Sequence, residues 1–184
     1  MIALVIVLVI VILAAAWLIG SYNGFIRLRN KIEEAFSAMD VSLKKRYDLI
    51  PNYVETVKGY ARHESETLNR VIEARNRALH ASTPEERIEQ DSALAGSMRS
   101  LFALSESYPE LKSNTNFIDL QNQLARIEEE IAGSRRYYNA VVNQFNTKTE
   151  TFPGNVLAGI FGFQRKPLYE VRDEAERENI RISF

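Results

Sequence analysis

The stretch from Ile2 to Ile19 reads IALVIVLVIVILAAAWLI and contains no charged and no strongly polar side chain. At a rise of about 1.5 Å per residue, a helix of this length spans about 27 Å, close to the ~30 Å hydrocarbon core of a bilayer. Each central Val, Ile or Leu contributes roughly −0.3 to −0.6 kcal/mol to insertion. Trp17 and Tyr22 stand where aromatic rings reach the headgroup level. We therefore expect residues 1–20 to form a single transmembrane anchor.

A cleaved signal peptide is the alternative interpretation of this segment, because Ala14-Ala15-Ala16 satisfies the small-residue cleavage pattern. The apolar run lacks a basic leading region and continues beyond these alanines to Ile19, which favours an uncleaved anchor. Three basic residues follow the run, with no acidic residue between Ser21 and Ile32: Arg27, Arg29 and Lys31. The positive-inside rule then predicts an external N-terminus, a cytoplasmic bulk and headgroup contacts for these three residues.

The composition restricts the classes of function. The chain has 184 residues, 23 basic and 24 acidic, and a formal net charge of −1, so no bulk field attracts nucleic acid. It contains no cysteine, which excludes disulfides, thiol nucleophiles and thiolate metal sites. The part that follows the anchor is the size of one ordinary domain. Only eight glycines and five prolines are present, as is typical of a helical protein.

Helical periodicity begins directly after the anchor. Apolar residues recur at spacings of three and four at Leu28, Ile32, Ala35, Met39, Leu43, Tyr47 and Ile50. We expect the first helix to leave the bilayer and continue into the domain. Pro51 is expected to end, kink or restart this helix, because an interior proline loses a hydrogen bond. The same spacing continues at Val54, Val57, Ala61, Glu64, Leu68, Val71, Arg75 and Ala78, so residues 22–80 should form two long helices or one kinked helix.

Two further helices follow from local signals. Thr83, Pro84 and Glu86 form a capping box that starts a third helix, which should end at Tyr108-Pro109. The fourth helix runs from Phe117 towards the break at Phe152-Pro153-Gly154. The sequence therefore predicts an all-α fold, with an antiparallel four-helix bundle over residues 21–153 and an irregular tail over residues 154–184.

Catalytic motifs are absent from the sequence. His63 and His80 do not sit at metal-ligand spacing, and no phosphate loop or nucleophile motif occurs, so we expect no enzyme activity, no metal and no cofactor. Two charged residues fall on apolar stripes, Glu64 and Arg135. If both point inward they need partners, because an unpaired buried charge costs several kcal/mol. A buried polar layer that fixes helix register is the favoured interpretation, and a ligand pocket is the alternative.

The region after the bundle is apolar but too short to span a bilayer. It either packs across the end of the bundle or contacts a partner or the membrane surface, helped by Arg165 and Lys166. Confinement to a plane raises effective concentration, so we expect a homo-oligomer. Its contact residues, or those for another membrane protein, should be Val156, Leu157, Ile160, Phe161, Phe163, Ile180, Ile182 and Phe184.

Several ungapped blocks carry a family resemblance: Tyr22-Asn23-Gly24, KRYDLIPN at 45–52, VETVKGYA at 54–61, YPELK at 108–112, RRYYN at 135–139 and FGF at 161–163. With these blocks the chain resembles the LemA family of bacterial membrane proteins over nearly its whole length. One departure is Phe145, where the family commonly has a tyrosine. The resemblance implies a helical bundle on one N-terminal anchor, without established catalytic residues. Family members are often encoded near membrane metalloproteases and other envelope-stress components.

These observations predict a membrane-anchored cytoplasmic scaffold or adaptor of the bacterial inner membrane. One alternative is an accessory or regulatory subunit of a membrane protease or transporter. Another is a small-ligand sensor, which would need a pocket among the helices.

Overall fold

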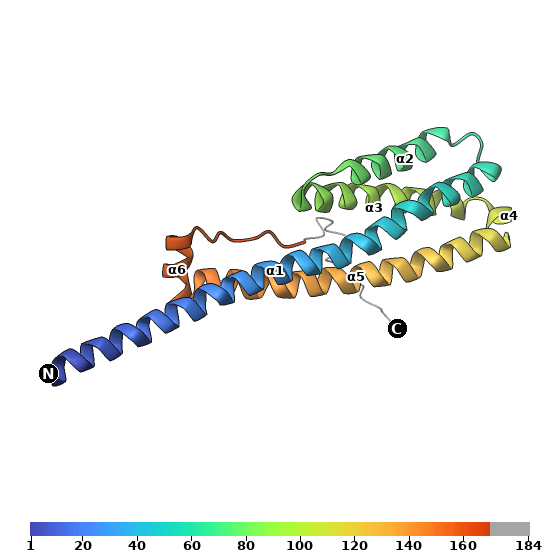
Figure 1. Ribbon diagram of the computed structural model, residues 1–184. Helices are drawn as coiled ribbons and strands as arrows, with labels where there is room; N and C mark the ends of the chain where they lie inside the picture. Colours follow the sequence, from blue (N-terminus) through green and yellow to red (C-terminus); the bar gives the residue numbers. More distant parts are fainter. Residues whose placement is uncertain (170–184) are drawn as a thin grey trace, which may run out of the picture. The chain divides into compact units, whose positions relative to one another are not determined.

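The computed structural model describes residues 1–169, and in this part of the chain it consists of helices with short connections and no strand (Figure 1). The helices are α1 (Ile2–Tyr60), α2 (Ser65–His80), α3 (Pro84–Glu106), α4 (Pro109–Lys112), α5 (Thr115–Glu150) and α6 (Gly154–Phe161). The prediction of an all-α fold with a long apolar N-terminal helix is confirmed. Three of the expected contact residues, Ile180, Ile182 and Phe184, lie outside the described residues.

The chain divides into two compact units. Unit 1 contains Met1–Ala38 and Arg135–Leu168, and unit 2 contains Met39–Ser134 together with Tyr169. Helices α1 and α5 each contribute one part to each unit. The domain boundaries at residues 20 and 153 that the sequence suggested stay a prediction.

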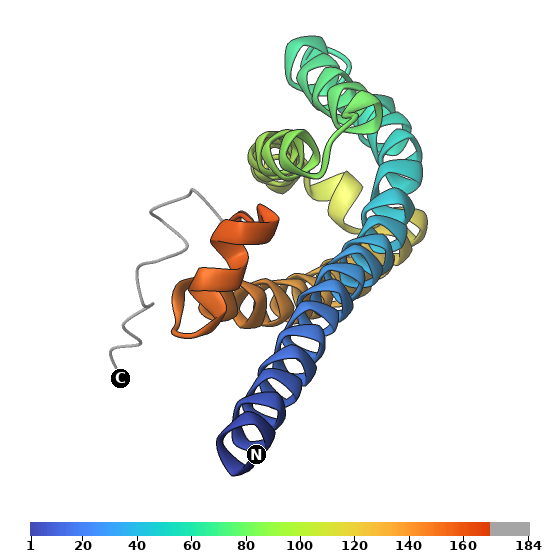
Figure 2. The same cartoon turned by 60° about the vertical axis from the view of Figure 1, so that its left-hand side comes forward.

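Unit 1 begins with the apolar part of α1, and the side chains of residues 1–20 are exposed. Beyond it, Phe25 contacts Phe145 and Phe36 contacts Tyr138, so these parts of α1 and α5 run antiparallel. Figure 2 shows α6 turning sharply away from the end of α5. The turn requires Gly154, because a Cβ there would collide with the backbone carbonyl of Lys148.

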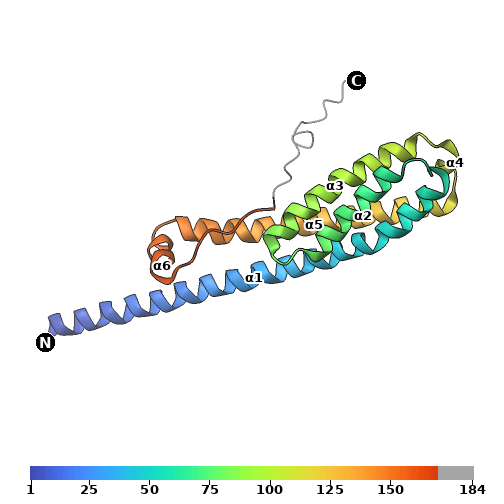
Figure 3. The ribbon, with the colours of Figure 1, turned by 90° about the horizontal axis from the view of Figure 1, so that it is seen from above.

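Unit 2 packs parts of α1 and α5 together with α2, α3 and α4. Lys45 pairs with Glu130, and Tyr60 accepts a hydrogen bond from Asn114, so the two long helices are antiparallel here as well. Figure 3 shows α2 and α3 side by side. The core contains the fully buried side chains of Met39, Leu43, Tyr47, Ile50, Tyr53, Leu94, Leu101, Leu111 and Phe117.

The helix boundaries test the local signals in the sequence. The Oγ1 of Thr83 accepts a hydrogen bond from the Glu86 amide at 3.1 Å, and the Glu86 carboxylate accepts from the Thr83 amide at 3.3 Å, so the predicted capping box is confirmed. At Pro51 the chain remains helical, and α1 ends at Tyr60 instead. The interruption at residues 61–64 was not predicted, because Ala61 and Glu64 fit the apolar spacing of the helices around them.

Candidate functional site

Unit 1 contains a cluster of aromatic rings next to the end of the apolar segment. This basal aromatic cluster consists of Tyr22 and Phe25 on α1, Phe145 on α5, and Phe161 and Phe163 at the end of α6. The ring centroids of Tyr22 and Phe161 lie 4.8 Å apart, and the Phe25 and Phe163 rings stack at 4.6 Å. The cluster therefore fixes α6 at the level of Tyr22 on α1.

Lys148 closes the basal aromatic cluster on the α5 side. Its Nζ lies 4.6 Å from the centroid of the Phe25 ring and donates a hydrogen bond to the Ser21 carbonyl at 3.1 Å. Burial lowers the pKa of the Lys148 amine, and the positive charge of Arg27 lowers it further. The contact between Lys148 and Ser21 independently places the end of α5 at the level where the apolar segment ends.

Helix α6 leaves part of its apolar surface in contact with solvent. We define the α6 patch as Phe152, Val156, Ile160 and Phe161, of which Phe152 is the most exposed at 82%. Leu157 and Ala158 on the same helix are buried. The expected contact residues are therefore divided: Leu157 is buried, and Phe163 is half-buried and stacks on Phe25 within unit 1. Contact of these residues with a partner stays a prediction.

The other residues assigned to the membrane interface also lie in unit 1. Arg27, Arg29 and Lys31 are exposed, and none forms an ion pair with another described residue. Trp17 is exposed, while Tyr22 contacts Phe161 and Phe163. Headgroup contact for these residues stays a prediction, because no lipid is present.

Unit 2 holds a buried polar cluster that the sequence did not predict. Arg46 on α1 pairs with Asp91 on α3, and both side chains are at most 1% exposed. The Nη1 atom of Arg46 donates a hydrogen bond to the Glu128 carboxylate on α5 at 2.9 Å. The hydroxyl groups of Tyr47 and Tyr169 donate to the Asp91 carboxylate. Three helices and the segment after α6 thus meet around the Arg46–Asp91 ion pair.

The predicted buried layer of Glu64 and Arg135 is not what the structure contains. Glu64 is half-buried in the connection that precedes α2. Because α1 has already ended at Tyr60, Glu64 does not lie on the apolar face of that helix. Arg135 is half-buried and belongs to unit 1. A usable signal for the real pair existed, because Arg46 lies three residues after Leu43 and Asp91 three residues before Leu94, both on apolar stripes.

A second buried polar group of unit 2 is the hydroxyl of Tyr53. Its side chain is fully buried and its ring packs against Phe102 and Phe117. Burial raises the pKa of Tyr53 to about 12, although the neighbouring polar side chains of Ser105 and Gln121 oppose part of this shift. The hydroxyl therefore stays neutral through the physiological range.

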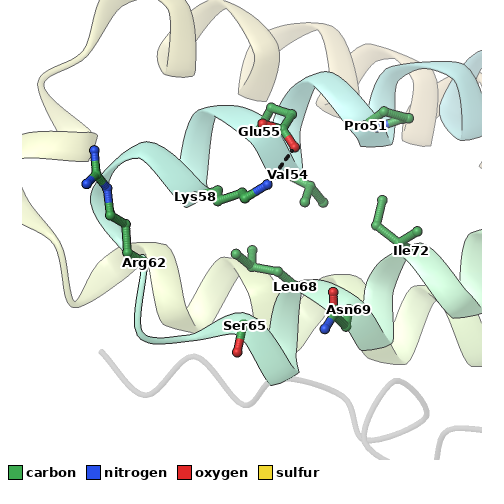
Figure 4. Close-up of a pocket in the computed structure, with 9 residues that line it drawn as sticks. All are labelled: Pro51, Val54, Glu55, Lys58, Arg62, Ser65, Leu68, Asn69 and Ile72. Carbon is green, nitrogen blue, oxygen red and sulfur yellow. Dashed lines mark hydrogen bonds and ion pairs between the residues drawn. The ribbon is translucent and has the colours of Figure 1, made fainter.

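A groove of about 180 Å³ lies between the end of α1 and α2 in unit 2 (Figure 4). Its apolar side chains, including Val54 and Leu68, face across it from the two helices. Charged side chains stand beside them, and Glu55 and Lys58 form an ion pair at 3.2 Å. The full lining is Pro51, Val54, Glu55, Lys58, Arg62, Ser65, Leu68, Asn69 and Ile72. Among residues 1–169, no group of three or more metal-binding side chains occurs.

Known proteins are similar to this chain over most of its length. The chain is 27% identical to Protein LemA of Metamycoplasma hominis, covering 90% of this chain and 75% of that protein. It is 24% identical to the magnetosome protein MamQ 2 of Paramagnetospirillum magneticum, covering 91% and 72% of the two chains. It is 22% identical to the magnetosome protein MamQ of Magnetospirillum gryphiswaldense, covering 80% and 64%. The profile of the LemA family matches residues 35–184, and the chain belongs to this family.

Proposed function

We propose that this protein is a non-catalytic helical adaptor anchored in the bacterial inner membrane. The observation that carries the proposal is the continuity of α1. Its N-terminal part is apolar, exposed and long enough to cross a bilayer, and the same helix supplies core residues to both compact units. Any partner bound to the folded part is thereby tied to the membrane through one unbroken helix.

The orientation follows from the charges beside the span. Arg27, Arg29 and Lys31 are exposed and without ion-pair partners among the described residues, so they are available to anionic headgroups on one side only. This favours a cytoplasmic location for both units and an external N-terminus. The relatives from magnetotactic organisms are named for the magnetosome and not for a reaction, which also supports a structural role.

The groove between α1 and α2 is the candidate partner surface of the adaptor. At about 180 Å³ it is smaller than the roughly 300–1,000 Å³ of pockets that enclose small ligands. Of its apolar side chains, Val54 and Leu68 are buried and the other two are half-buried, and charges of both signs line its edge. Such a surface suits a few side chains of a protein segment, which favours the adaptor over the small-ligand sensor.

Photocrosslinking followed by purification in mild detergent tests the proposal. A benzophenone amino acid placed at Asn69 lies in the groove, and the same amino acid at Asn76 is an exposed control seven residues further along α2. The adaptor predicts a discrete crosslinked product at Asn69 that is weak or absent at Asn76.

The identity of the product separates the alternatives. A product with a second copy of the chain supports self-association, whereas a product with a membrane protease or transporter supports an accessory subunit. Equal, diffuse labelling at Asn69 and Asn76 would contradict the groove as a partner surface.

A further inference from the structure

We propose that the α6 patch inserts into the interfacial layer of the same bilayer that α1 crosses. The partner of this surface is then lipid, and not a second protein chain. The inference rests on the proposed membrane anchor and adds a second point of attachment. It concerns the residues Phe152, Val156, Ile160 and Phe161.

The height of α6 relative to the anchor supports lipid contact. Tyr22 lies three residues beyond Ile19, which is about 4.5 Å along a helix. The Phe161 ring contacts Tyr22 at 4.8 Å, and Lys148, near the end of α5, contacts the Ser21 carbonyl at 3.1 Å. Two independent contacts within unit 1 therefore hold the end of α5 and the end of α6 at the boundary of the apolar segment. An interfacial helix inserts about 5–10 Å into this layer.

The chemistry of α6 matches the interface. The helix contains no charged residue, and apart from Asn155 its exposed side chains are aliphatic or aromatic. Leu157 and Ala158 are buried. Basic side chains flank it at Arg165 and Lys166, and both are exposed. Apolar residues bordered by cations are the pattern of segments that lie on anionic bilayers.

The segment after α6 is held in place and so keeps the patch oriented. The side chain of Asn146 on α5 donates to the Lys166 carbonyl and accepts from the Lys166 amide, each at 2.8 Å. Tyr138 donates to the Pro167 carbonyl at 3.3 Å. With Phe163 stacked on Phe25, the C-terminal end of α6 is fixed, and the helix presents its exposed side chains without further folding.

Size argues for lipid over a second copy. Stable protein interfaces cover about 800 Å² on each partner. Four side chains on a helix of eight residues with its preceding loop cover less than this. Contact with a bilayer does not require this minimum area, because the anchor already holds the patch at the membrane surface and little further entropy is lost on insertion.

Fluorescence quenching in vesicles tests the proposal directly, because Trp17 is the only tryptophan. The full chain is reconstituted in phosphatidylcholine–phosphatidylglycerol vesicles that contain lipid brominated near the headgroup end of the acyl chain. In a Trp17→Phe background, Phe161→Trp reports on the patch. Tyr137→Trp is the matched control, because Phe161 is 44% exposed and Tyr137 45%. Tyr137 lies eleven residues before Lys148, or about 16 Å along α5 from the level of Ser21.

Interfacial insertion predicts about twofold quenching of Phe161→Trp and little quenching of Tyr137→Trp. A second reporter, Ile160→Trp, should be quenched as strongly, since Ile160 is 67% exposed. Helix content measured by circular dichroism verifies that each variant is folded.

Quenching of Trp17 in the wild-type protein distinguishes failure of the proposed anchor from failure of the proposed lipid contact by α6. If Trp17 is quenched but neither patch reporter is, the anchor stands and lipid contact by α6 is overturned. If Trp17 is also unquenched, the anchor itself fails. The inference would likewise be overturned if the fluorescence emission of a patch reporter is blue-shifted but not quenched by brominated lipid, and chemical crosslinking joins two copies of the chain.

Discussion

The helices of the two units are held together by different kinds of contact. Unit 2 joins its helices through a buried ion pair, Arg46 with Asp91, to which three neighbouring side chains add hydrogen bonds. Unit 1 joins its helices through aromatic rings around Phe25 and leaves apolar side chains of α6 exposed. Buried charge specifies a unique arrangement of water-facing helices, whereas exposed apolar surface next to an apolar helix suits a membrane boundary. The difference supports the proposal that unit 1 meets the bilayer surface and unit 2 the aqueous phase.

The largest expected effect comes from breaking the buried ion pair of unit 2. Asp91→Asn leaves the Arg46 guanidinium without its buried counter-charge and should lower the free energy of unfolding by about 3–5 kcal/mol. Urea unfolding of the protein in detergent, followed by circular dichroism, measures the loss. Asp48→Asn is the control: it removes an exposed pair with Lys44 and should cost about 0–1 kcal/mol. Similar losses in both variants would contradict a special role for the buried pair.

The next effect concerns the apolar part of unit 1. Val9→Arg places a charge near the centre of the span and should oppose insertion by about 2.5–3.5 kcal/mol. The variant should be released by alkaline washing to a greater extent than the wild type. Val41→Arg, at an exposed valine in unit 2, is the control and should remain bound. Full retention of the Val9→Arg protein would mean that another segment is the main anchor.

A smaller effect is expected at the start of α3. Thr83→Ala removes the side chain that accepts the Glu86 amide and should lower the stability of unit 2 by about 1 kcal/mol. Thermal unfolding measures the change. Ser82→Ala, one residue earlier and outside the capping box, should have little effect. Equal changes in the two variants would show that the cap contributes nothing specific.

At neutral pH the smallest effect is that of Tyr53, which carries a pH dependence in the alkaline range. Its pKa is raised by burial to about 12, so between pH 10 and 12 the unfolded chain loses this proton before the folded chain does. Stability from this group is complete below pH 10 and is lost as the pH rises towards 12. Tyr53→Phe should therefore flatten the fall in melting temperature over this range. Tyr137→Phe, at an exposed tyrosine, should leave the profile unchanged, and identical profiles for all three proteins would contradict the assignment.

Local sequence signals predicted much of the fold. The Thr83 capping box and the prolines at Pro109 and Pro153 mark helix boundaries that the structure contains. Each signal acts through a hydrogen bond or a steric clash within a few residues, so it can be read without tertiary context. The connection at residues 61–64 escaped prediction because it contains neither glycine nor proline, and α2 begins without a side-chain cap at Glu64.

The candidate sites were less predictable because they depend on contacts distant in sequence. Arg46 meets Asp91 only when α1 packs against α3, and before folding it is one of three consecutive basic residues. The apolar side chains between Val156 and Phe163 were predicted as one surface, but Leu157 is buried and Phe163 stacks on Phe25. The spacing of apolar residues shows which face of a helix is apolar. It does not show which of these side chains are buried by the rest of the chain and which stay exposed.

The most direct test of the account is the topology of α1. The chain has no cysteine, so Ile2→Cys and Ser82→Cys each introduce a unique label on opposite sides of the expected span. We predict that a membrane-impermeant maleimide reaches Ile2→Cys from outside intact inner membranes and reaches Ser82→Cys only after lysis. Labelling of Ser82→Cys in intact cells, or loss of the Ile2→Cys label by cleavage, would contradict the anchored and cytoplasmic arrangement.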